Sequence, residues 1–256
     1  MKIRMIALGT CLALMIALGV WAVMSSVSEQ DIGSYMTSLH DRTDSQIFNA
    51  RLATRKINNV EIQPGGTFSF LKVVGPWTAD VGYKKAPVSY DGELVRSWGG
   101  GVCQVSTTLY NAALLAGLDI VERNHHYWPA RYAPLGRDAA VAYEDIDLKF
   151  KNNLPCPIRI VGRIQGENLI FKIMSARRPD YKVVVESEMR SVSLPNEVLQ
   201  DRSANGQGRM KLVNRGHPGF CVATYREFIT PHGNRRQFLS LDSYPEMNRI
   251  VRITRR

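Results

Sequence analysis

Apolar residues recur at helical spacing in two segments, and these segments predict the main helices of the chain. Between residues 102 and 116, apolar side chains stand three or four positions apart, and Gly117 follows where a C-terminal cap belongs. Between residues 46 and 58 a looser version of the same pattern appears. We therefore predict one helix that begins next to Cys103 and a second helix that precedes it.

Most of the remaining pattern is typical of strands and turns. Residues 61–90 are rich in glycine, proline and β-forming residues, and residues 125–146 are punctuated by proline and glycine, which predicts turns and extended segments. Further strands are predicted at Ile158–Val161 and Leu169–Ile173, as a hairpin around the polar residues 165–168, and then at residues 181–186, 208–214 and 220–229. The pattern therefore predicts an α+β fold with a β-rich C-terminal third.

The changes in pattern along the chain predict four regions. They are a transmembrane anchor or signal (residues 1–27), a polar tether (28–45), a mixed α/β domain (46–178) and a β-rich C-terminal extension (179–256). The extension is either a separate module that starts near Pro179 or a continuation of one sheet.

The N-terminal segment predicts the location of the protein. Residues 5–24 are almost entirely apolar, long enough to span a bilayer, and basic residues precede them while acidic residues follow. This asymmetry predicts a single-pass membrane protein whose bulk lies outside the cytoplasm. A cleaved signal peptide and a secreted protein are the alternative, but the run is long for a signal and no Ala-x-Ala site follows it.

Charge and cysteine content narrow the possible partners. The chain has 33 Lys and Arg against 23 Asp and Glu, a formal net charge of +10. For an exported domain, this excess of positive charge favours anionic wall polymers or lipid headgroups over nucleic acid as binding partners. The alternative is that the basic surface serves only solubility. Three cysteines follow the apolar segment, and an odd number indicates a free thiol. Cys156 and Cys221 either form a disulfide, which leaves Cys103 free, or are both reduced.

The run Gly99–Gly101 leads directly into Cys103 at the predicted start of a helix. Unpaired N–H groups and the positive end of the helix dipole favour a thiolate there. Glycines at positions 100 and 101 allow a backbone or a substrate to come close. The pattern is therefore that of a presented nucleophile, with the Cys103 N–H and Gln104 as the simplest donors to an oxyanion. The alternative is a tight turn followed by a buried, structural cysteine.

A long series of residues in this part of the chain resembles the VanW family of cell-envelope proteins. The matching positions are Pro64–Phe70, Gly75–Pro76, Gly82–Tyr83, Ala86–Val88, Asp91–Gly92, Gly99–Leu114, Glu122–Arg123, His126, Pro129, Tyr132, Pro134, Gly136–Ala139 and Asp147–Asn152. A weaker match continues through Gly216–Gly219 and Asp242–Pro245. Some members of this family have been assigned L,D-transpeptidase activity on peptidoglycan, with the motif cysteine as nucleophile.

The resemblance implies His126 as the base that serves Cys103, because the family histidine lies three positions before a proline; His125 is the alternative. A third polar group would orient the imidazole, and Asp138 is the first choice, with Asp147 as the alternative. The order of cysteine and histidine resembles that of papain-like enzymes. The chain departs from the common family pattern at Asn124, where a second histidine is frequent, and at Tyr127, where serine is frequent.

Two arginines near these positions, Arg123 and Arg137, are candidates for binding the carboxylates of a stem peptide, although either would equally form an ordinary salt bridge. We expect no cofactor and no metal, since neither His-x-x-x-His nor Cys-x-x-Cys occurs and the glycine run lacks the Lys-Ser/Thr of a phosphate loop.

The resemblance implies a protein that acts on peptidoglycan stem peptides by cysteine acyl transfer. The alternatives are a hydrolase that uses the same thiol and a non-catalytic wall-binding module in which Cys103 is structural. The sequence does not separate transfer from hydrolysis, because both pass through the same thioester.

Overall fold

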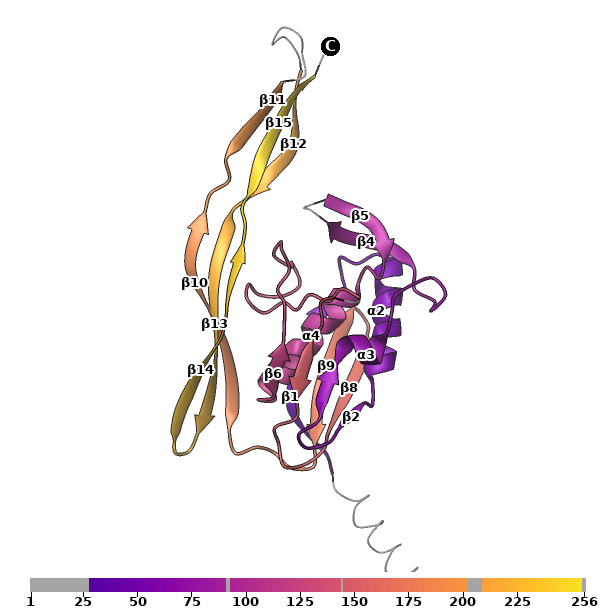
Figure 1. Cartoon of the computed structure of the whole chain (residues 1–256), viewed down its shortest axis with the longest axis vertical. Helices are drawn as coiled ribbons and strands as arrows, with labels where there is room; N and C mark the ends of the chain where they lie inside the picture. The colour runs from indigo at the N-terminus through magenta and orange to yellow at the C-terminus, as the bar shows by residue number, and fades with distance from the viewer. Residues whose placement is uncertain (1–27, 91–92, 144, 202–208, 255–256) are drawn as a thin grey trace, which may run out of the picture.

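The computed structural model describes residues 28–90, 93–143, 145–201 and 209–254. They form a body of helices and short sheets and, beside it, a long twisted blade of strands (Figure 1). The fold is mostly β-strand with few helices, so it is richer in strands than the predicted α+β fold, and its C-terminal region is β-rich as predicted.

Each helix of the body begins at a residue suited to that position. The helices are α2 (Asp44–Ile57), α3 (Phe70–Val74) and α4 (Val102–Leu115). Thr43 caps α2, and its side chain and that of Gln46 bond reciprocally to each other's backbone N–H. After α4, Gly117 takes a positive φ of 79° and donates to Leu114 O, as predicted for the C-terminal cap.

The strands of the body form a main sheet, a smaller sheet and a hairpin. The main sheet has the order β1 (Gln30–Ser38), β9 (Asn168–Ser175), β8 (Ile158–Gln165) and β2 (Glu61–Ile62); the smaller sheet has the order β3 (Thr67–Ser69), β7 (Lys149–Lys151) and β6 (Asp119–Glu122); the hairpin is β4 (Lys85–Tyr90) with β5 (Glu93–Trp98). The predicted hairpin of residues 158–173 is confirmed as β8–β9, with Gln165 opposite Asn168.

Helix α4 lies on the main sheet against β1 and β9, and α2 lies beside it against β8 (Figure 1). The approach of β1 to α4 is close, because a Cβ at Gly33 would lie less than 3.0 Å from the backbone of Ala116. Every residue of α4 except Cys103 and Leu115 is buried. The thiol is therefore carried by the most deeply enclosed helix of the body.

The predicted tether at residues 28–45 is wrong, since Gln30–Ser38 is β1, an edge strand of the main sheet paired along its length with β9. Its sequence is polar because the strand does not need a large apolar face. Thr37, for example, is buried and its hydroxyl lies 2.8 Å from that of Thr108 on α4. The predicted anchor at residues 1–27 lies outside the described residues. Among the residues described, no helix is long and apolar enough to cross a membrane.

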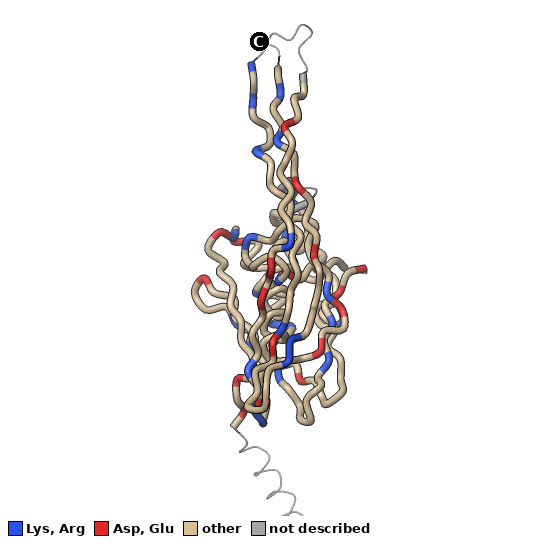
Figure 2. Tube along the Cα trace, turned by 90° about the vertical axis from the view of Figure 1, so that its left-hand side faces the viewer, with Lys and Arg blue, Asp and Glu red and all other residues tan. Residues whose placement is uncertain are grey.

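The blade consists of two three-stranded sheets that follow one another along its length (Figure 1). The sheet next to the body has the order β10 (Lys182–Ser193), β13 (Gly219–Thr230) and β14 (Gly233–Tyr244); the outer sheet has the order β11 (Glu197–Asp201), β15 (Met247–Thr254) and β12 (Arg209–His217). Acidic and basic positions are interspersed over body and blade (Figure 2).

The inner sheet of the blade is bonded to the body. Arg226 of β13 is 1% exposed, and its guanidinium donates to Leu118 O at 2.7 Å, just beyond the end of α4. Tyr181 packs edge-on against Phe228 at the same seam, and its hydroxyl donates to Ala116 O. The C-terminal region therefore packs directly on the helix that carries Cys103.

Candidate active site

The glycines before Cys103 allow other parts of the protein to approach the start of α4. Gly101 is the N-cap, with a φ of 103°, and a Cβ there would lie less than 3.0 Å from the backbone oxygen of Gln46 in α2. A Cβ at Gly100 would lie 2.6 Å from Pro87 O in β4. The side chain of Asn49 donates to Gly100 O at 2.9 Å. The predicted close approach is thus made by α2 and β4, and neither glycine is placed to contact a substrate through this face.

Cys103 lies in the first turn of α4 and is partly exposed, whereas its neighbours in the helix are buried. Its Sγ donates to Val141 O at 3.4 Å. This carbonyl belongs to the irregular segment between β6 and β7, which also carries His126 and Asp138. The thiol therefore faces the segment in which the sequence analysis placed its partners.

His126 and Asp138 form a tight pair. Nδ1 of His126 lies 2.5 Å from Asp138 Oδ2, and the His126 backbone N–H donates to the same oxygen at 2.7 Å. A carboxylate only accepts hydrogen bonds, so Nδ1 carries the proton and Nε2 faces the other way. Nε2 lies 3.4 Å from the hydroxyl of Tyr132, and the ring also interacts with the Cys103 sulfur. The structure thus brings the three predicted residues, Cys103, His126 and Asp138, together.

The electrostatic environment of Cys103 favours its thiolate form. Burial acts to raise the pKa of the Cys103 thiol, but hydrogen bonding and charge from His126 outweigh burial and lower that pKa. Burial acts to lower the pKa of His126, but its bonds to Asp138 and Cys103 raise it to about 10. Asp138 is itself buried, yet His126 and Arg123 hold the pKa of its carboxyl well below the usual range. The direction of these shifts favours a thiolate at Cys103 beside an imidazolium at His126, with the Asp138 carboxylate behind it.

Helix α4 also fixes the backbone around Asp138. Ser106 Oγ donates to Ala139 O at 2.7 Å, and Thr107 Oγ1 accepts the Ala139 N–H at 2.9 Å. One helical turn further on, Asn111 Nδ2 donates to Arg137 O at 2.7 Å. These polar residues lie in a buried helix because they satisfy the backbone of this segment. One helix thereby holds both the thiol and the carboxylate.

Four of the predicted site residues have their side chains engaged elsewhere. Gln104 faces β1 and donates to Ser38 O at 2.7 Å, so its side chain is not an oxyanion donor beside Cys103. Arg137 donates to Asn111 Oδ1 at 2.7 Å and covers the ring of Tyr35. Asp147 accepts from Ser69 and Leu71 at the start of α3. His125 Nδ1 lies against His126 O.

Arg123 is buried between two carboxylates. Its guanidinium bonds both oxygens of Asp242 at 2.6 and 2.7 Å and Asp138 Oδ1 at 3.2 Å. Of the two roles considered for Arg123, the structure therefore favours the internal salt bridge over binding of a stem-peptide carboxylate. The sequence analysis assigned no role to Asp242 or to Tyr244, whose hydroxyl donates to Asp138 Oδ1 at 2.6 Å. The signal that could have found them is the weaker part of the family resemblance, which includes Asp242–Pro245.

The cysteines and the hollows of the surface complete the description. Cys103, Cys156 and Cys221 are all free thiols, so the suggested disulfide between the last two is absent from the part of the chain described.

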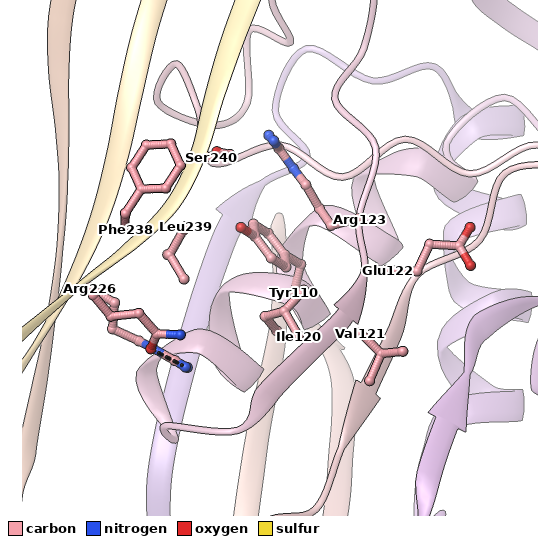
Figure 3. A pocket seen from close by; sticks show the side chains of 10 residues that line it. Tyr110, Ile120, Val121, Glu122, Arg123, Arg226, Phe238, Leu239 and Ser240 are labelled. Carbon is pink, nitrogen blue, oxygen red and sulfur yellow. Dashed lines mark hydrogen bonds between the residues drawn. The ribbon is translucent and has the colours of Figure 1, made fainter.

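A hollow at the seam between body and blade is lined by Tyr110, Arg123, Arg226 and Phe238, among others (Figure 3). Its lining includes neither Cys103 nor His126. Within the described ranges, no group of three or more His, Cys, Asp or Glu residues could hold a metal ion.

Two curated proteins are similar to this chain. The uncharacterized protein YoaR of Bacillus subtilis (strain 168) is 38% identical over 183 residues, which are 71% of this chain and 58% of YoaR. The vancomycin B-type resistance protein VanW of Enterococcus faecalis (strain ATCC 700802 / V583) is 31% identical over 147 residues, which are 55% of this chain and 54% of that protein. The chain thus spans a little over half the length of these relatives.

Among solved structures, the crystal structure of HP0197-G5 matches 30% of this chain and all of that chain, at 17% identity. Its TM-score of 0.18 is too low to support an argument about the fold. The model of the family described as VanW like protein matches residues 45–174, which include Cys103, His126 and Asp138. The chain belongs to the VanW family.

Proposed function

We propose that this protein is a cell-envelope acyltransferase that acts on peptidoglycan stem peptides in the manner of an L,D-transpeptidase. The observation that carries the proposal is the chain of contacts from Cys103 through His126 to Asp138, with the thiol at the start of a buried helix. Such a chain is the general arrangement of an activated nucleophile, its base and an orienting acid. The order in the sequence is that of papain-like enzymes.

In the proposed reaction the Cys103 thiolate attacks the carbonyl carbon between the third and fourth stem residues. The C–N bond breaks, His126 gives its Nε2 proton to the departing amine, and D-alanine leaves while a thioester forms. An acceptor amine then attacks the thioester, His126 takes the amine proton, and the thiolate is restored. Asp138 accepts from Nδ1 throughout and stabilises the imidazolium. The first turn of α4 supplies N–H groups and a positive dipole end near the developing oxyanion.

The relatives support a role in the cell wall. One of them is named as a vancomycin resistance protein, and the family model covers the three residues of the site. We extend that association with the cell wall, and with resistance to vancomycin, to this chain as part of the proposal. The alternatives that use the same residues are a peptidase or amidase, in which water accepts the acyl group, and a binding module in which no bond is broken.

The muropeptide products separate these possibilities. Incubation of the purified protein with peptidoglycan and analysis by mass spectrometry should show release of D-alanine and new links between the third residues of two stems. Trimmed stems without links would indicate the hydrolase, and unchanged muropeptides under competent conditions would refute catalysis.

Variants at three positions make this test specific. Cys103→Ala should abolish D-alanine release, and His126→Ala should reduce it by about 10²-fold or more, since general base catalysis contributes 10²–10⁴-fold. His125→Ala is the matched control and should retain most activity, because its Nδ1 is bonded to a backbone carbonyl. If His125→Ala were as inactive as His126→Ala, the assignment of the base would be wrong.

We also propose that residues 5–24 remain in the mature protein as a membrane anchor, with the site on the outer side. The support is the apolar run with basic residues before it and acidic residues after it. Mass spectrometry of the membrane fraction should recover peptides from residues 1–25. A mature form that begins after Met24 would show a cleaved signal instead.

A further inference from the structure

The C-terminal blade reaches the centre of the candidate active site. Two residues of the blade, Asp242 and Tyr244, do so. They lie near the end of β14, outside residues 45–174, which the family model matches. Asp242 is 3% exposed and Tyr244 is 1% exposed. Their partners are Arg123 and Asp138 of the body.

The two oxygens of Asp138 have separate partners. Oδ2 accepts from the backbone N–H and from Nδ1 of His126. Oδ1 accepts from Tyr244 at 2.6 Å and from Arg123 at 3.2 Å. Because both donors bind Oδ1, they fix the rotation of the carboxylate that presents Oδ2 to the histidine.

Asp242 controls how much of Arg123 is available to Asp138. Each oxygen of Asp242 accepts from Nη1 of Arg123, and only Nη2 reaches the Asp138 carboxylate. Without Asp242, the buried guanidinium would have Asp138 as its one remaining carboxylate partner among these groups. A closer, two-pronged pair with Arg123 would then draw Asp138 away from His126.

The loop that carries Asp138 is also seated on the blade. Tyr244 Oη accepts the Gly136 N–H at 3.0 Å, and Thr224 of β13 donates to Gly136 O at 3.2 Å. A Cβ at Gly136 would lie less than 3.0 Å from Thr224 Oγ1. The hydroxyl of Tyr244 thus has a partner on each side, which a purely apolar packing role would not require.

We propose that the blade completes the active site, with Asp242 and Tyr244 as positioning residues that hold Asp138, and through it the His126 ring, against Cys103. This inference rests on the proposed role of Cys103 as nucleophile. It assigns a function in the reaction to a region outside residues 45–174, which the family model matches.

The test follows the reactivity of the thiol and needs no substrate. In the full-length chain, the rate of iodoacetamide labelling of each cysteine is measured against pH by mass spectrometry of peptides, and the midpoint for Cys103 is compared between variants. Tyr244→Phe and Asp242→Asn should each raise this midpoint by about half to one pH unit, since a misplaced imidazolium no longer stabilises the thiolate.

The sign of the shift distinguishes positioning from charge alone. Removal of the negative charge of Asp242 would by itself favour the thiolate and lower the midpoint, and Tyr244→Phe changes no charge. Matched controls on the same sheet are Glu188→Gln, which removes a carboxylate paired with Arg190 at 2.8 Å, and Tyr225→Phe, which removes a hydroxyl bonded to Arg190. Both should leave the midpoint unchanged.

A fifth variant addresses folding. Asp242→Glu keeps the charge and should return the midpoint toward that of the natural chain, even if Asp242→Asn folds poorly. An unchanged or lowered midpoint in Tyr244→Phe or in Asp242→Asn would overturn the inference. If the midpoints shift as expected while peptidoglycan stays unmodified, the acyl-transfer proposal fails and the positioning of the thiol–histidine pair stands.

Discussion

Substitution of Gly101 by alanine should test whether the glycine run serves the packing of α2 or the entry of a substrate. Gly101 has a φ of 103°, a conformation that L side chains rarely adopt, and its new Cβ would meet the backbone oxygen of Gln46. Because that oxygen belongs to the main chain of α2, it cannot move aside as a flexible side chain would.

The expected cost has two parts. A positive φ in a residue other than glycine costs about 1–2 kcal/mol, and overpacking a tight contact adds about 1–3 kcal/mol. The total of about 2–5 kcal/mol corresponds to a fall in Tm of roughly 4–20 °C for a chain of this size. Gly65 provides a matched control, because its φ is 76° but nothing lies within 4 Å of its ideal Cβ. Gly65→Ala should therefore show only the first part, a fall of about 2–8 °C.

Thermal unfolding followed by circular dichroism measures both variants. Gly101→Ala should also slow the labelling of Cys103 at neutral pH, because the start of α4 has to shift, while Gly65→Ala should not. Equal falls in Tm for the two variants, together with unchanged labelling, would refute the packing argument and restore substrate access as the reason for the glycines.

Two further predictions concern ionisation at the site. Cys103 should react with iodoacetamide faster than Cys156 or Cys221 near neutral pH, since His126 lowers the pKa of its thiol; equal or slower labelling would indicate a structural thiol. Asp138 has a depressed pKa in the folded protein, so the stability it provides is present above its unfolded value of 3.8 and is lost as the pH falls below it. The Tm of Asp138→Asn should therefore fall less steeply below pH 4 than that of the natural chain, and parallel curves would contradict this.

The local part of the fold was predictable from the sequence. The helix after Gly101 and the β8–β9 hairpin follow from periodicity and turn residues, which act over a few positions. The first strand was missed because Gln30–Ser38 is polar and pairs with β9, which lies far along the chain. Its stability comes from the backbone hydrogen bonds to β9 and from the contact of Thr37 with Thr108 of α4, and neither leaves an apolar pattern in the sequence.

The candidate site was also predicted only in part from the sequence. Cys103 stands out in the sequence through its glycines, and His126 through the family resemblance. For Arg123 the choice between a salt bridge and a ligand site stayed open, because the sequence cannot show that an arginine in the body meets Asp242 on a strand of the blade. An arginine enclosed by two carboxylates and one held ready for a ligand have the same appearance in a sequence.

The hold of α4 on both Cys103 and the Asp138 backbone has a consequence for the order in which the protein loses structure. Amides in this enclosed helix should exchange their hydrogens only when the whole body unfolds. The segment from Tyr127 to Leu135 has few backbone bonds to its surroundings and should exchange through local opening at lower denaturant. Opening of that segment would release His126, while the Cys103 thiol and the Asp138 carboxylate keep their positions relative to each other. The protein should therefore pass through a folded but inactive state, which recovers rapidly on dilution because only one loop has to close.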